Sequence, residues 1–236
     1  MPQDRQLEIK GFLETSFLDW PGEVASVLFL SGCNFRCPFC HNHELVLNHQ
    51  AHPTLDWREI EPRLARFDGW IDGVVVSGGE PTLSLGLESL LRRIKHLGLK
   101  VKLDTNGSRP SVLRSLIGQG LVDHVAMDVK GPLDEISYAR ATGRPGILEP
   151  VLESLEILAG SSRPYTLRTT VVPGLHSEKD VLLLAEQLQT RSAVWSLQSF
   201  NPADALDCSF RRVEAWDQDY FEDLSRRART IQSGAA

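Results

Sequence analysis

The chain has 236 residues, of which 42% are hydrophobic and 24% charged, and its formal net charge is −6. The acidic balance and the lack of a long basic run argue against a general nucleic-acid surface. No apolar run approaches the roughly 20 residues that span a bilayer, and the first ten residues lack the apolar core of a signal peptide. We therefore expect a cytoplasmic protein with no membrane contact. A single domain should cover residues 1–236, with its core at about 9–202 and a C-terminal helical extension over 203–236.

Short β-rich runs alternate along the chain with amphipathic stretches. The runs that predict strands are residues 24–30, 73–77, 99–104, 122–128, 165–172 and 194–200. The stretches that predict helices are residues 85–97, 111–117, 150–158, 178–188 and 214–230. Nearly continuous apolar runs of this length are typical of parallel strands covered on both faces. Six strand–helix repeats predict an α/β fold, interpreted as a partial (β/α)6 barrel of mostly parallel strands, with an open doubly wound sheet as the alternative.

Three of the four cysteines lie within eight residues, directly after the first predicted strand. Cys33, Cys37 and Cys40 follow the spacing C-x3-C-x2-C. Three thiolates on one short loop can hold one face of a [4Fe–4S] cluster and leave the fourth iron open, as a catalytic metal requires. Cys208 is far away in sequence and is typical of an ordinary thiol. A zinc site completed by a nearby histidine is the competing interpretation.

Glycine and charged residues follow the later strands, at the edge where parallel α/β folds place function. Gly78 and Gly79 end the second strand and precede Glu80. Such glycines let backbone approach a ligand, and the carboxylate can bind a cation such as a substrate ammonium. The charged residues at the ends of the next three strands are Asp104, Asp128, Lys130 and Arg168. Charges at the ends of apolar strands are costly unless they are solvated, paired or bound to a ligand.

With these segments the chain resembles the radical SAM superfamily, whose enzymes cleave S-adenosylmethionine (SAM) at a [4Fe–4S] cluster. The cysteine loop is similar to the family motif C-x3-C-x-aromatic-C, with Phe39 as the aromatic residue, and the GGEP segment is similar to the GGE motif. The resemblance implies one cluster on Cys33, Cys37 and Cys40, with SAM chelating the open iron. It also implies adenine contacts beside Phe39. The GGE motif with Glu80 would bind the amino group of the methionine part of SAM.

The resemblance narrows to the glycyl-radical-enzyme activases, which carry similar D-T-N-G, D-x-K and R-x-x-V-V-P-G segments. It implies that Asp104, Asp128 and Lys130 surround the methionine and ribose of SAM. Arg168 would bind the carboxylate of SAM. The resemblance also leaves room for a monovalent cation coordinated by the two aspartates and nearby carbonyl groups.

The segment before the first predicted strand also carries the resemblance. It reads D-W-P-G where the activases have D-G-P-G, so Trp20 replaces the first glycine. In the family, this aspartate and the histidine after the third cysteine lie near the glycyl loop of the partner. That position implies a partner-peptide role for Asp19 and His41. Residues 42–72 contain no further cysteine, so we expect one cluster, with electrons from a flavodoxin or ferredoxin.

The resemblance covers about residues 9–202 and is closest to the activators of anaerobic ribonucleotide reductases. It predicts an enzyme that abstracts a hydrogen atom from a backbone glycine of a glycyl-radical enzyme, in the first place anaerobic ribonucleoside-triphosphate reductase. Two alternatives stay open. A small-molecule radical SAM enzyme, such as a 7-carboxy-7-deazaguanine synthase, would share the cysteine loop and the GGEP segment. A non-catalytic zinc-binding protein would explain the cysteines but not the later segments.

Overall fold

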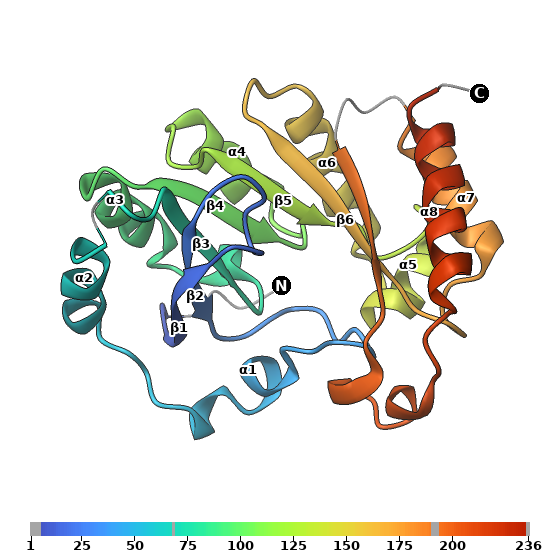
Figure 1. The fold of residues 1–236 in the computed structure, drawn as a ribbon, viewed down its shortest axis with the longest axis horizontal. Coiled ribbons are helices and arrows are strands. Elements are labelled where there is room, and N and C mark those ends of the chain that lie inside the picture. The colour runs from blue at the N-terminus through green and yellow to red at the C-terminus, as the bar shows by residue number, and fades with distance from the viewer. Residues whose placement is uncertain (1–5, 68, 190–193, 235–236) are drawn as a thin grey trace.

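The computed structural model describes residues 6–67, 69–189 and 194–234, and a single seven-stranded sheet runs through them (Figure 1). The strands are β1 (Ile9–Ser16), β2 (Ala25–Leu30), β3 (Gly73–Gly78), β4 (Lys100–Thr105), β5 (His124–Asp128), β6 (Tyr165–Val171) and β7 (Val194–Ser199). Strands β2 to β7 are parallel and adjacent in chain order, while β1 pairs antiparallel with β2. This order confirms the predicted α/β fold with six parallel strands. A doubly wound sheet would reverse its strand order.

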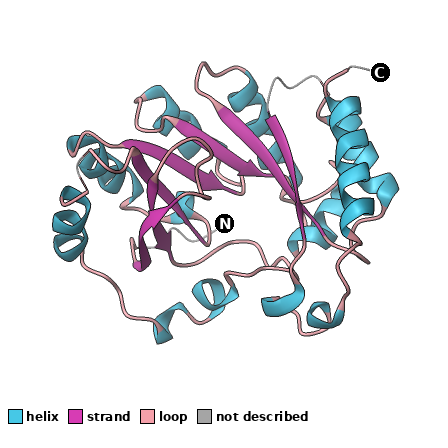
Figure 2. Cartoon of the chain, viewed as in Figure 1, coloured by secondary structure: helices cyan, strands magenta, loops and turns pink. Residues whose placement is uncertain are grey.

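Most of the helices lie along the outer side of the curved sheet, as Figure 2 shows, and the first, α1 (His43–Leu47), lies on its open side. The others are α2 (Trp57–Ala65), α3 (Leu87–His96), α4 (Pro110–Gly118), α5 (Glu135–Thr142), α6 (Leu148–Ala159), α7 (Glu178–Gln187) and α8 (Gln218–Gln232). All five predicted helices are present. No helix in the described part of the chain is long and apolar enough to cross a membrane. The single-domain organisation over 1–236, whose two ends lie outside the described residues, stays a prediction.

Strand β1 and helices α1, α2 and α5 were not predicted. The β1 segment mixes charged residues with Gly11, and the missing side chain at that position accommodates the ring of Phe29 on β2. Helix α2 contains Pro62, which removes a backbone donor, and α5 has only eight residues between its cap residues Asp134 and Gly143. These elements depend on neighbours in the fold more than on a local hydrophobic pattern.

The two faces of the parallel strands differ in chemistry. Side chains of successive residues alternate between the faces. On β4, Val101 and Leu103 are buried in the main apolar core with leucines of α3, α4 and α6, while Lys102 and Asp104 lie on the other face. The same alternation on β5 sends Met127 outward and Asp128 inward. The apolar pattern therefore does not extend to the inner face near the C-terminal ends of these strands, where charged side chains line a cavity.

Near the N-terminal ends of β2 and β3 the inner face is apolar and is covered by Trp20. This side chain is buried against Val27 and Val75, and its ring lies 6.1 Å from that of His124. A Cβ atom on Gly73 would come within 2.8 Å of the Trp20 ring. The tryptophan that replaces glycine in the D-W-P-G segment thus fills the barrel interior near the N-terminal ends of the strands.

The barrel is open between β1 and β7, which do not pair with each other in the described residues. The segment that carries α1 runs along this opening toward the end of β7 (Figure 1). There the ring of His43 contacts Asp204 at 2.9 Å, and the backbone N–H of Asp207 donates to the carbonyl of Pro38 at 2.9 Å. The loop after β2 is thereby held to the loop after β7.

Candidate active site

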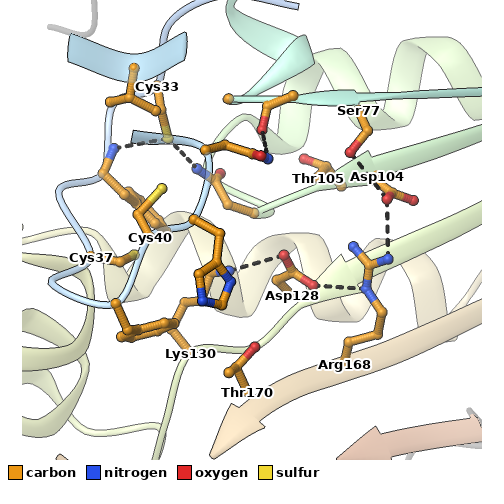
Figure 3. Close-up of a pocket in the computed structure, with 18 of the residues that line it drawn as sticks. Cys33, Cys37, Cys40, Ser77, Asp104, Thr105, Asp128, Lys130, Arg168 and Thr170 are labelled. Carbon is orange, nitrogen blue, oxygen red and sulfur yellow. Dashed lines mark hydrogen bonds and ion pairs between the residues drawn. The ribbon is translucent and has the colours of Figure 1, made fainter. Parts of the chain in front are cut away.

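A cavity of about 430 Å³ opens at the C-terminal ends of the strands. Its walls come from the loop after β2 and from the ends of the five strands that follow it. Twelve of the thirteen residues selected from the sequence line it: Asp19, Cys33, Cys37, Phe39, Cys40, His41, Gly78, Gly79, Asp104, Asp128, Lys130 and Arg168. Segments far apart in the chain thus meet at one site, and Figure 3 shows the cysteines facing the charged residues across it.

Backbone hydrogen bonds hold the cysteine loop in place. The Arg36 N–H donates to the carbonyl of Thr142 at 2.7 Å, and the Gly32 N–H donates to that of Leu45 at 2.8 Å. The Arg36 side chain donates to the carbonyl of Cys33 at 2.8 Å. Gly143 ends α5 with φ of 61°, and its missing Cβ leaves room for the carbonyl of Arg36. Contacts within the protein therefore hold the loop in this shape.

The three thiols form a donor set that suits an iron–sulfur cluster. Burial raises the pKa of Cys33 and of Cys37 to about 12 and also raises the pKa of Cys40, so these thiolates need positive metal charge beside them. The Sγ atom of Cys33 accepts from the Phe35 N–H at 3.3 Å and from Asn106 Nδ2 at 3.7 Å. Asn34 Nδ2 is a buried donor without a partner in the described part of the chain. Sulfur acceptors of a cluster would suit such donors.

Gly78 and Gly79 are required by the backbone of the cysteine loop. Gly78 has φ of 118°, and a Cβ atom there would lie 2.3 Å from the carbonyl oxygen of Leu30. A Cβ atom on Gly79 would lie 2.0 Å from the carbonyl oxygen of Gly32. Both glycines also line the cavity. The two glycines thus let the ends of β2 and β3 pack closely together. The backbone packed in this way forms part of the cavity wall.

Glu80 is the one selected residue that does not line the cavity. Its side chain is fully buried, and one oxygen accepts from Thr82 N–H at 3.1 Å, from the Thr82 hydroxyl at 2.5 Å and from the Thr105 hydroxyl at 2.7 Å. The other oxygen accepts from the Asn106 N–H at 2.6 Å. Burial raises the pKa of Glu80, and the hydrogen bonds oppose this rise. The carboxylate ties the end of β4 to the end of β3 in this structure.

A chain of ion pairs crosses the floor of the cavity (Figure 3). Arg168 bridges two carboxylates, with Nη1 at 3.1 Å from Asp104 and Nε at 2.9 Å from Asp128. Lys130 Nζ lies 2.9 Å from Asp128, and the Ser77 hydroxyl donates to Asp104 at 3.2 Å. Burial would raise the pKa of Asp128, but Arg168 and Lys130 lower it well below its usual range. The same pairing raises the pKa of Lys130 and of Arg168 against the effect of burial, so these three groups stay charged at neutral pH.

The two residues predicted to face a partner peptide differ in their surroundings. Asp19 lines the cavity and accepts from the Ser16 hydroxyl at 2.5 Å. His41 stacks on Phe200, with ring centroids 5.9 Å apart, and its Nε2 lies 2.6 Å from the carbonyl oxygen of Asn201. His41 thus joins the cysteine loop to the loop after β7 as well as lining the cavity.

Several lining residues were missed in the sequence. They include Phe29, Phe35, Asn42, Ser77, Thr105, Asn106, Thr170 and Gln198. Asn106 lies in an Asn-Gly pair, which is a common turn signal. Its position directly after β4, beside Asp104, was the available signal. Thr170 occupies an inward position two residues after Arg168, which the period-two pattern of a strand could have identified.

Comparisons with known proteins agree on the family. The model of the radical SAM superfamily matches residues 27–186. A Methanocaldococcus jannaschii protein described as a candidate glycyl-radical enzyme activating enzyme is 32% identical over 227 residues, covering 94% of this chain and 91% of that protein. The pyruvate formate-lyase-activating enzyme of Staphylococcus aureus is 31% identical over 176 residues, covering 70% of this chain and 68% of that enzyme.

Solved structures share the fold at low sequence identity. TYW1 with a lysine–pyruvate adduct bound superposes with a TM-score of 0.63 at 16% identity, over 86% of this chain and 72% of that one. Streptococcus suis SuiB bound to its precursor peptide SuiA has the same TM-score and identity, over 89% of this chain and 46% of that one. At this identity the likeness shows the fold alone.

Proposed function

Because the chain belongs to the radical SAM superfamily and to its glycyl-radical-enzyme activating enzymes, we propose that it abstracts a hydrogen atom from a backbone glycine of a partner enzyme. One observation carries the proposal: three cysteines and a chain of ion pairs face each other across one cavity that opens beside β7. In such a site, metal ligands lie opposite charged side chains that can bind a charged small molecule.

Cys33, Cys37 and Cys40 are the proposed ligands of a [4Fe–4S] cluster. A cluster bound there would supply the electron that cleaves SAM to methionine and a 5′-deoxyadenosyl radical. The loop keeps the three thiols on one side of the cavity, because its backbone is anchored by Leu45 and Thr142. The donors around Cys33 would stabilise a negatively charged sulfur.

Arg168 and Lys130 are the proposed contacts of the SAM carboxylate. A guanidinium has five N–H donors, and Arg168 uses one on Asp104 and one on Asp128, so donors stay free for a carboxylate. The aspartates fix the direction of the guanidinium and offer acceptors for the ribose. They are also the groups at which the family resemblance implies a monovalent cation. Phe39, whose ring lies 6.0 Å from Lys130 Nζ, would place the adenine beside the cluster loop.

Gly78 and Gly79 would line the site of the SAM ammonium, with Glu80 directly behind them. Glu80 was predicted to contact the ammonium itself. Its two oxygens accept from Thr82, Thr105 and Asn106, so we propose that it supports this wall by holding the ends of β3 and β4 together. A buried carboxylate with this many donors is a rigid anchor.

The proposed substrate is the glycyl loop of a glycyl-radical enzyme, in the first place anaerobic ribonucleoside-triphosphate reductase. Asp19 and His41 stand where such a loop would pass, since both line the cavity and His41 lies at the opening beside β7. The chain has four cysteines, three of them in the cluster loop, so we propose one cluster. The electron would then come from a separate flavodoxin or ferredoxin.

The test is anaerobic incubation of the reduced, cluster-loaded protein with SAM and candidate glycyl-radical enzymes, followed by electron paramagnetic resonance. The expected result is a glycine-centred doublet in a cognate enzyme, with anaerobic ribonucleoside-triphosphate reductase as the first candidate. A parallel incubation contains purine-like and pterin-like compounds instead of protein. Turnover of such a compound, with no doublet in any partner, would overturn the proposal in favour of a small-molecule enzyme.

A further inference from the structure

Lys102 is a buried cation in the middle of β4. Only 3% of the residue is exposed, and its Nζ lies 2.5 Å from Oδ1 of Asp104. A lysine is rarely buried to this extent unless it is paired, because removing the ammonium from water is costly. Asp104 lines the cavity and Lys102 does not, so Asp104 lies between Lys102 and the space that a ligand would occupy. None of the segments that identify the family includes Lys102.

Lys102 completes the pairing of the carboxylates on the cavity floor. Asp104 has Lys102 on one oxygen, and Arg168 with the Ser77 hydroxyl on the other. Asp128 has Arg168 on one oxygen and Lys130 on the other. Each of the four carboxylate oxygens thus already accepts from a cationic side chain. A metal cation at either aspartate would have to share each carboxylate oxygen with a cationic side chain that already donates to it.

The net charge of these five side chains also disfavours a metal cation at the two aspartates. Two aspartates face three cations, which leaves a net charge of +1. His124 lies on the same face and adds no positive charge at neutral pH, since burial and then the charge of Lys102 lower its pKa. An added monovalent cation would be repelled by this surplus. A SAM carboxylate would be attracted by it.

We infer that Lys102 supplies, from within the protein, the positive charge that a monovalent cation would otherwise supply at Asp104. SAM binding is then independent of potassium and sodium. Lys102 is a positioning residue, because it acts through Asp104 and does not touch the ligand. The inference rests on the proposed function only in taking this cavity as the SAM site.

The first test uses the unaltered, cluster-loaded protein. SAM affinity is measured by calorimetry in potassium chloride, in sodium chloride and in choline chloride at equal ionic strength. The expected affinities agree within about twofold, a difference of well under 1 kcal/mol. An affinity about tenfold weaker in choline chloride than in potassium chloride would overturn the inference. No SAM binding in any of the three salts would instead overturn the proposed function.

The second test replaces the ammonium by an uncharged chain of similar length, Lys102→Met. The variant is expected to bind SAM about tenfold more tightly in potassium chloride than in choline chloride. Its cluster-free form should melt at a higher temperature in potassium chloride, because an ion that binds only the folded state stabilises it. The matched control is Lys100→Met, whose ammonium on the same strand pairs with Glu23 at the surface. Salt-independent SAM binding and melting of Lys102→Met would contradict the inference; should the variant not fold, the measurement on the unaltered protein still decides.

Discussion

Alternate residues of strands β3 to β6 form the outer and the inner face of the sheet, and the two faces differ in function. Outward residues such as Leu103 and Leu167 are fully buried among the leucines of the helices. Inward residues such as Asp104 and Arg168 pair with one another around a cavity. On each strand, a residue that stabilises the fold is thus followed directly by one that faces the ligand site. Variants of the two faces should therefore change different measurements.

The largest effect is expected at the cysteine loop. Replacing Cys33, Cys37 or Cys40 with alanine removes one of three proposed cluster ligands, and SAM cleavage should be abolished. The unaltered protein, reconstituted anaerobically, should hold about four iron and four sulfide ions per chain. Cys208→Ala is the control, since this exposed thiol lies outside the cavity, and it should keep both cluster and cleavage. Stoichiometric zinc without acid-labile sulfide would support the zinc interpretation instead.

A cavity on the outer face should cost stability and leave the chemistry intact. Leu103→Ala is expected to lower the free energy of unfolding by about 2–5 kcal/mol, because it removes a fully buried side chain between β4 and the helices. Denaturant titration of the cluster-free protein measures this change. The control, Leu85→Ala, alters a leucine that is 71% exposed and should stay within about 0.5 kcal/mol. Equal losses in the two variants would show that the outer face is not the main source of stability.

A Glu80 variant tests whether the cavity wall at the ends of β3 and β4 supports the SAM site. In Glu80→Gln, an amide N–H₂ would meet donors from Thr82, Thr105 or Asn106, so the end of β4 should shift. SAM affinity should fall about tenfold, as for the loss of a charge-assisted hydrogen bond of ~1.5–3 kcal/mol. Calorimetry on the cluster-loaded variant measures it. Thr82→Val is the milder companion, because it removes one of the donors and keeps the charge. An unchanged SAM affinity in Glu80→Gln would show that Glu80 is only a turn residue and does not support the SAM site.

Asp19 should separate peptide positioning from SAM chemistry. Asp19→Ala is expected to keep cleavage of SAM in the absence of partner and to lower the glycyl-radical yield severalfold. The loss is moderate because a single carboxylate at the cavity rim supplies one of several contacts. His41→Ala should show the same separation with an added loss of order in the loop after β7, since His41 stacks on Phe200. Activation at the unaltered rate by both variants would remove these residues from the peptide site.

The smallest effect concerns a histidine behind the inner face. The His176 N–H at Nε2 donates to the carbonyl of Lys130 at 2.8 Å, and Nδ1 accepts from the Val172 N–H at 3.0 Å. Burial lowers the pKa of His176 below its value in the unfolded chain. The unfolded chain therefore binds a proton first, and stability is lost as the pH falls below about 6.5. In His176→Gln this part of the pH dependence should disappear. The assignment of this pH dependence to His176 would be contradicted if His176→Gln lost as much stability between pH 7.5 and 5.5 as the unaltered protein.

Sequence reasoning identified the six parallel strands because apolar, β-branched runs are a local signal. It missed β1, whose pairing with β2 depends on Gly11 meeting Phe29 across the sheet. The cysteines were identified by their spacing alone. The partners of Glu80 could not be identified, because Thr105 and Asn106 lie 25 and 26 residues further along the chain. Lys102 escaped because one charged residue within an apolar strand gives no indication of where it points.

The central claim is that the radical generated in this cavity takes its hydrogen atom from a backbone glycine. The direct measurement uses a cognate glycyl-radical enzyme that carries deuterium on its glycine α-carbons, with unlabelled SAM and a chemical reductant under anaerobic conditions. The predicted result is one deuterium in the 5′-deoxyadenosine that accompanies the glycine-centred signal, as mass spectrometry would show. Unlabelled 5′-deoxyadenosine formed at the same rate, with no radical in the partner, would contradict the claim.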